Sequence, residues 1–303
     1  MDETSEITRW DEIAWNGIAF RKPSCWEIAT IGRNYLMLGT RTDPRMEITW
    51  GNPSGTAAHR RSLKQLQAAK RSFGRGKHGP ADAWIPPQIW LDALSAYEVS
   101  GFSWNKPAGN AIVVSCPSCN RTALFQFYQD GSEDPGPFHT LVSRLLSTFR
   151  DHSENSRQQW AVFDVRATLP AALQIKSYQF SSGFMAMDFF AKGLKISLYR
   201  WSPASVLLAG RKLSEFAGSL PFYPGSASET HRDLNRIEWG KSPSIRLLNR
   251  LAAFLSAGFS NHRLLIRHIH EANRILAVRS ESRQPMDSNL FDQIVADYET
   301  ATT

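Results

Sequence analysis

The chain has 303 residues, of which 42% are hydrophobic and 21% are charged. This composition is typical of a globular protein and excludes extended disorder, and the length suits two domains of about 150 residues each. The formal net charge of +7 favours anionic partners, although it says nothing about the fold.

The cysteine content and the hydrophobic runs indicate a cellular compartment. Three cysteines in 303 residues are too few for a disulfide framework. The first nine residues are polar and acidic, without the apolar core of a secretory signal. The apolar runs fall far short of the roughly 20 residues that span a bilayer. We therefore expect a cytoplasmic protein that does not enter a membrane.

The first half of the chain predicts short strands mixed with helices. Apolar residues that alternate mark strands, whereas apolar residues three and four positions apart mark helices. The expected elements are strands at 18–20, 26–28 and 46–50, a helix over 57–73, a helix from Pro87, a hairpin of 111–115 with 122–128, and a helix over 141–149. The polar stretch 151–159 is expected to be an interdomain linker.

The second half predicts a similar series. Its expected elements are strands within 160–199, a helix that begins at Pro203 and carries Phe216, a helix that begins at Ser242 and ends before Gly258, strands at 264–270 and 275–278, and a helix from Asp287. Proline near the start and glycine after the end are typical helix boundaries.

The order of motifs in the two halves predicts an internal duplication. Matched residues, in the same order, are Ile18 and Val165, Ile48 and Ile196, Trp84 and Trp239, Gly101 and Gly258, and Asn120-Arg121 and Asn273-Arg274. We predict an α+β fold of two tandem, duplicated domains, 1–152 and 153–303, with largely antiparallel sheets packed by helices. The alternative is a chance similarity between unrelated strands and helices.

The strongest candidate for a site is Cys116-Pro-Ser-Cys119 in the expected hairpin turn. Two thiolates at this spacing can bind one zinc ion, but a structural site needs four ligands. His268 and His270 would point to the same face of their strand and could complete the set. We therefore predict a single zinc held by these four residues, with unpaired surface or core residues as the alternative. A redox pair is less favoured, because a strand and not a helix follows the motif.

A second candidate is a basic segment between residues 57 and 81, which contains no acidic residue. Its basic residues are Arg60, Arg61, Lys64, Lys70, Arg71, Arg75 and Lys77. Such a segment suits a phosphate backbone, and the glycines within 74–79 would let backbone N–H groups approach phosphate. The alternative is a solvated helix face.

Arg121 and Arg274 form a third candidate, because each follows a matched asparagine. Repeated arginines can line a paired binding site. The alternative is that each pairs with a carboxylate and packs its aliphatic stem.

The sequence contains no catalytic motif such as a nucleophile elbow, a His-Glu-x-x-His pair or a dinucleotide-binding fingerprint. We therefore expect a non-catalytic binding or scaffold protein whose partner, a protein, binds in the groove between the domains. One alternative is a nucleic-acid-associated protein that uses segment 57–81. The other is a metal or redox enzyme centred on Cys116 and Cys119.

Overall fold

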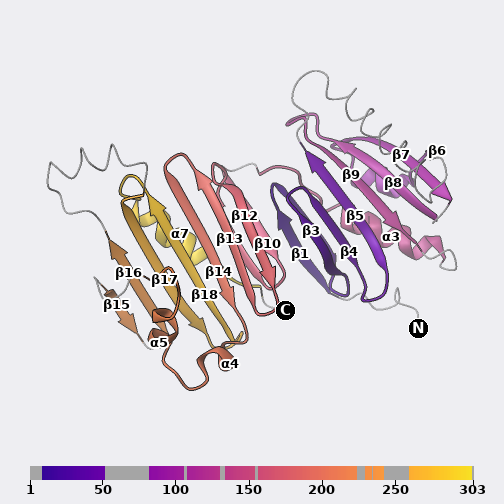
Figure 1. The fold of residues 1–303 in the computed structure, drawn as a ribbon. Helices are drawn as coiled ribbons and strands as arrows, with labels where there is room; N and C mark the ends of the chain where they lie inside the picture. Colours follow the sequence, from indigo (N-terminus) through magenta and orange to yellow (C-terminus); the bar gives the residue numbers. More distant parts are fainter. Residues whose placement is uncertain are drawn as a thin grey trace. The chain divides into compact units, whose positions relative to one another are not determined.

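The computed structural model divides the chain into two compact units, Met1–Ser153 and Glu154–Thr303. The residues that it describes are 9–51, 82–105, 108–129, 134–153, 156–223, 229–233, 235–241 and 259–301. These parts are mostly β, with antiparallel sheets and few, short helices (Figure 1). The expected antiparallel sheets are confirmed, whereas the expected α+β class is corrected to mostly β. The helices expected at 57–73 and from Ser242 lie outside the described residues.

Unit 1 is built around one antiparallel sheet with the strand order β3-β4-β5-β9-β8-β7-β6. Its elements are β1 (Trp10–Trp15), β2 (Ile18–Pro23), β3 (Glu27–Gly32), β4 (Tyr35–Gly39), β5 (Pro44–Gly51), β6 (Asp82–Trp84), α2 (Gln88–Ala93), β7 (Glu98–Asn105), β8 (Ala108–Ser115), β9 (Thr122–Tyr128) and α3 (Pro135–Leu146). The hairpin of β1 and β2 turns at Asn16 and Gly17, both with positive φ, as a tight two-residue turn requires.

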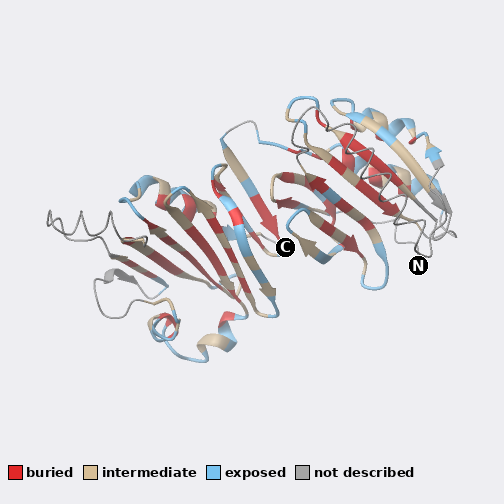
Figure 2. Cartoon of the chain, turned by 45° about the horizontal axis from the view of Figure 1, so that its top comes forward, coloured by how far each residue is buried: buried red, intermediate tan, exposed pale blue. Residues whose placement is uncertain are grey.

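The core of unit 1 lies on one face of this sheet. Alternation along β5 and β9 places Ile48 opposite Phe125 and Met46 opposite Phe127, and all four side chains are buried. Figure 2 shows where buried residues lie along the strands. Trp90 of α2 packs on this face, with its ring 5.0 Å from that of Phe127. The short helices of unit 1 therefore cover the apolar side of the sheet.

Unit 2 has the same succession of strands, in the order β12-β13-β14-β18-β17-β16-β15. Its elements are β10 (Arg157–Val162), β11 (Val165–Pro170), β12 (Gln174–Ser181), β13 (Phe184–Ala191), β14 (Leu194–Trp201), α4 (Ala204–Leu208), α5 (Leu213–Gly218), β15 (Glu229–Asp233), β16 (Arg236–Lys241), β17 (Asn261–Ile269), β18 (Arg274–Ser282), α7 (Ser288–Asp297) and β19 (Glu299–Thr300). β11 pairs with β10 and with β19.

Helices cover both faces of the unit 2 sheet. α5 packs on the face that carries Trp201, where the rings of Trp201 and Phe216 lie 5.5 Å apart. α7 packs on the opposite face, where the buried ring of Phe291 lies under the Arg263 guanidinium. Among the described residues, none of the helices is long and apolar enough to cross a membrane.

Three expectations about local structure are corrected. The helix expected from Pro203 to Phe216 is two helices, because Ala209 and Gly210 between α4 and α5 both have positive φ. Trp84 lies in β6, the last strand in the order of the unit 1 sheet. Trp239 lies in β16, the last strand but one in the order of the unit 2 sheet, so the two tryptophans do not occupy matching places. The stretch 151–159, expected to be a linker, contains the boundary between the two units, but it begins with a buried residue and ends inside β10.

Candidate metal centre

The turn between β8 and β9 brings two thiols to one place in unit 1. The Cys116 N–H donates to the Arg121 carbonyl at 2.9 Å, and the Asn120 N–H donates to the Cys116 carbonyl at 3.0 Å. Asn120 has φ of 57°, a left-handed conformation that asparagine tolerates better than most residues. This closed turn leaves Cys116 buried and Cys119 half-buried.

Asp151 and His152 follow the end of α3 and meet these thiols. The Cys119 thiol donates to Asp151 Oδ2 at 2.9 Å, and His152 Nδ1 lies 2.7 Å from Asp151 Oδ1. The same His152 nitrogen lies 3.8 Å from Cys116 Sγ. One donor atom from each of the four residues falls within 4.8 Å of all the others. Two sulfurs, one oxygen and one nitrogen therefore converge on one point.

Neighbouring groups hold Asp151 in position. The Tyr97 hydroxyl donates to Asp151 Oδ1 at 3.3 Å. Arg121 donates through one nitrogen to the backbone carbonyls of Asp151 and Gly17, which links the centre to the turn of β1 and β2. Asp151 is only 2% exposed, so its carboxylate depends on these partners rather than on water.

Burial and the hydrogen bond to Asp151 raise the pKa of Cys119 to about 12. Burial and the same carboxylate also raise the pKa of Tyr97. At neutral pH the network is thus a protonated thiol and a neutral phenol, both donating to one carboxylate. Such a thiol is a poor nucleophile, because the thiolate is the reactive form, and this argues against redox chemistry at Cys119.

The two histidines expected as ligands, His268 and His270, lie in unit 2. Their rings are 3.8 Å apart, and His270 Nε2 lies 2.6 Å from Asn235 Oδ1. Burial and the neighbouring His270 lower the pKa of His268. Their role as metal ligands stays a prediction from the sequence.

Asp151 and His152 were missed because they open a polar stretch that is typical of a linker. One signal in the sequence could have identified them: two adjacent residues of metal-binding type lie a few residues after the end of an amphipathic helix.

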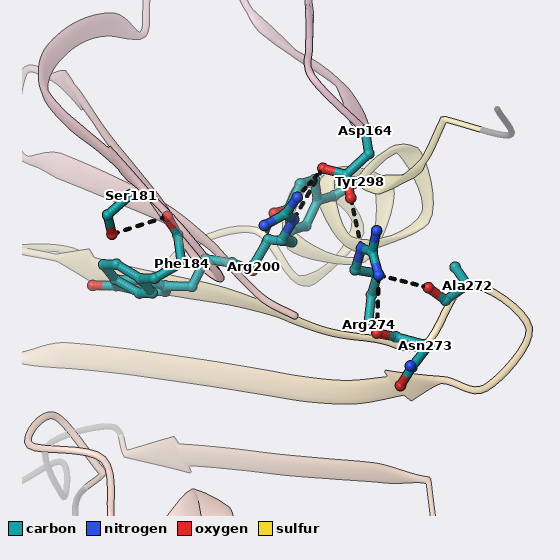
Figure 3. Close-up of polar contacts among 9 residues, drawn as sticks. Asp164, Ser181, Phe184, Arg200, Ala272, Asn273, Arg274 and Tyr298 are labelled. Atoms are coloured by element: carbon teal, nitrogen blue, oxygen red, sulfur yellow. Dashed lines mark hydrogen bonds and ion pairs between the residues drawn. The ribbon is translucent and has the colours of Figure 1, made fainter. Parts of the chain in front are cut away.

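The matched arginines occupy similar places but bind different groups. Arg121 precedes β9 and binds backbone carbonyls. Arg274 begins β18, and its Nε donates to Asp164 Oδ2 at 2.6 Å (Figure 3). Arg200 donates to the other oxygen of the same carboxylate, at 2.9 and 2.5 Å. Figure 3 shows Asp164 between these two guanidinium groups.

The basic segment cannot be placed in the same way, since its residues lie outside those that the structure describes. These are Arg60, Arg61, Lys64, Lys70, Arg71, Arg75 and Lys77.

Comparison with known proteins finds no matching family and no matching characterised protein. Among solved structures, a protein from Bacteroides thetaiotaomicron is 13% identical with a TM-score of 0.27, and the match covers 50% of each chain. The T6SS immunity protein TplEi from Pseudomonas aeruginosa, solved with an "L" peptide, is 10% identical with a TM-score of 0.30, and the match covers 98% of this chain and 100% of TplEi. Similarities this low assign neither a family nor a function to the chain.

Proposed function

We propose that the chain is a non-catalytic binding protein made of two duplicated units, and that its partner is another protein. The shared strand succession of the two sheets supports the duplication. We expect the partner in the groove between the units, because binding sites concentrate at domain junctions. Reduced thiols and the absence of a disulfide among the three cysteines are compatible with the cytoplasm as the compartment of action.

Matched contacts within each unit also support the duplication. Arg121 contacts Gly17 in the turn between β1 and β2, and Arg274 contacts Asp164 in the turn between β10 and β11. After α3 and after α7, the chain pairs with the second strand of its own unit, β2 or β11. These contacts at equivalent points favour duplication over a chance similarity of strands.

The observation that carries the binding function is an aromatic patch on unit 2, formed by Phe163, Tyr178 and Phe180. The Phe163 ring lies 5.1 Å from that of Phe180, which stacks on Tyr178 at 5.4 Å. Phe163 is 49% exposed, and the other two are half-buried. Aromatic side chains are enriched in the centres of protein interfaces, where they bury a large area at a low cost in conformational entropy.

The backbone of Phe163 strengthens this inference. Its φ of 56° is left-handed, which costs a non-glycine residue about 1–3 kcal/mol. At the matching turn, unit 1 has Asn16 and Gly17, which adopt positive φ far more readily. A half-exposed phenylalanine is an unfavourable choice for this backbone conformation, so a binding role is the simplest reason for it.

We expect Phe163→Asn to raise the stability of unit 2 by about 1 kcal/mol and to weaken partner binding about 10-fold or more. A photo-cross-linking amino acid at position 163 would capture the partner, and calorimetry with that purified partner would give the affinities. Val206→Ala is the control, because Val206 is 69% exposed on α4. Unchanged affinity for Phe163→Asn, or an equal loss for Val206→Ala, would contradict the proposal. The gain in stability excludes unfolding as the cause of lost binding.

A second candidate, nucleic-acid binding, rests on the seven basic residues of segment 57–81. If the segment contacts about six phosphates, affinity for duplex DNA or RNA should fall roughly 1,000-fold between 50 and 200 mM salt. Reversing Arg60, Lys64 and Arg71 to glutamate should abolish the binding, as measured by fluorescence anisotropy. Binding that is absent, or insensitive to salt, would eliminate this candidate.

A further inference from the structure

We propose that Cys116, Cys119, Asp151 and His152 bind one zinc ion in a closed, structural site within unit 1. This replaces the histidines of unit 2 by two donors that already lie beside the thiols. The zinc ion is a bound group in addition to the protein partner of the proposed function, which does not require it.

The distances suit tetrahedral zinc. Zinc bonds of about 2.3 Å to sulfur and 2.0–2.2 Å to nitrogen or oxygen place the donors roughly 3.3–3.8 Å apart. Cys116 Sγ and His152 Nδ1 are already 3.8 Å apart, and all four donors lie within 4.8 Å of one another. The Cys119–Asp151 contact of 2.9 Å would lengthen once both atoms bind the ion. The four donors therefore already lie near the spacing of a tetrahedral zinc site.

The donor types favour zinc over calcium and magnesium. Two thiolates disfavour calcium and magnesium, which take oxygen ligands. Thiolate, imidazole and carboxylate are all common zinc ligands, and four protein donors leave no open position for a reacting water. The site is therefore structural rather than catalytic.

The charges also balance. Zinc binding releases one proton from each thiol to solvent, so two thiolates, one carboxylate and one neutral imidazole around Zn²⁺ carry a net charge of −1. The Arg121 guanidinium, bonded to the Asp151 carbonyl, supplies the compensating positive charge. Tyr97 donates to Asp151 Oδ1 and orients the carboxylate, as the outer partners of zinc ligands commonly do.

The position of the site explains what the ion would do. Cys116 and Cys119 lie in the β8–β9 turn, whereas Asp151 and His152 lie next to Ser153, the last residue of unit 1. Zinc would therefore fasten the end of the unit to its sheet.

The first test is the metal content of the full chain, purified without chelator and measured by mass spectrometry. We expect one zinc per chain in the wild type and its loss in Cys119→Ser and in His152→Ala. Cys25→Ser is the matched control, because Cys25 is exposed and outside the cluster, and it should keep the ion. The double variant His268→Ala, His270→Ala should also keep it. Loss of zinc in that double variant, with retention in His152→Ala, would overturn the proposal.

The second test begins with the wild type, so its main result does not depend on how a variant folds. Cobalt(II) added to chelator-treated wild type should give the thiolate charge-transfer band and the intense visible bands of a tetrahedral site, and zinc should displace it. The conservative variant Tyr97→Phe should keep these bands with zinc affinity lowered about 10-fold. Wild-type protein that binds neither ion would overturn the proposal.

Discussion

Trp90→Ala should lower the free energy of unfolding of unit 1 by about 3–5 kcal/mol, the usual cost of removing a buried tryptophan. The Trp90 side chain is completely buried, and it joins three parts of the unit. Its ring contacts Phe127 of the sheet, Trp84 of β6 and His139 of α3 at 5.0, 5.5 and 5.4 Å. Its Nε1 donates to the His139 carbonyl at 2.9 Å.

Alanine would leave a large cavity and would remove the Trp90 hydrogen bond to the partly buried His139 carbonyl. The adjacent Ile89→Ala is the control, since Ile89 is 43% exposed and its truncation should cost at most about 0.5 kcal/mol. Urea unfolding followed by circular dichroism measures both variants. If Trp90→Ala lowered the free energy of unfolding no more than Ile89→Ala does, the packing of α2 on the sheet would not depend on Trp90.

Asp164→Asn should lower the free energy of unfolding of unit 2 by about 3 kcal/mol. The carboxylate is 16% exposed and accepts from Arg200, which is 14% exposed, and from Arg274, which is 26% exposed. Asparagine keeps the shape but removes the charge, so it leaves two partly buried guanidinium groups without their counter-ion. Glu299→Gln is the control, because its ion pair with Arg166 is about half exposed and should contribute less than about 1 kcal/mol.

The same substitution should change how stability depends on pH. Burial alone would raise the pKa of Asp164, but the hydrogen bonds and charges of Arg274 and Arg200 outweigh it and hold the pKa below its ordinary value. A depressed carboxylate pKa stabilises the fold above the unfolded pKa of about 3.9 and loses this effect as the pH falls through the folded value. The difference in the free energy of unfolding between wild type and Asp164→Asn should therefore become smaller below about pH 4. A constant gap down to pH 2 would contradict this assignment.

Many of the strands and several helices could be predicted from local patterns. Alternation located β2, β5, β9 and β18, and Asp287 marked the start of α7, where its side chain caps the helix. Pro87, which stands directly before α2, marked the start of that helix without capping it through a side chain. The thiols of Cys116 and Cys119 were recognised from spacing alone, because a two-residue gap in a tight turn brings them together.

The partners of these groups could not be predicted, because they depend on how distant segments pack. Nothing near Cys119 in the sequence shows that the end of α3 returns to its turn, so Asp151 was taken for a linker residue. Arg274 suggested a carboxylate partner, but only the hairpin turn after β10 identifies it as Asp164. β6, β7, β15 and β16 were also missed; Gly101 interrupts the apolar pattern of β7, and charged residues fill much of β15.

The strand succession shared by the two sheets also determines how each unit can fold. β3, β4 and β5 pair in chain order, as do β7, β8 and β9, so each set can form early from local contacts. In the described part of unit 1 the two sets pair only at β5 and β9, where Met46 pairs with Phe127 across more than half of the unit's length. Such a non-local pairing must close a long loop before it gains any contact energy, which makes it a slow step. We therefore expect the centre of each sheet, its most buried part, to be the last to assemble.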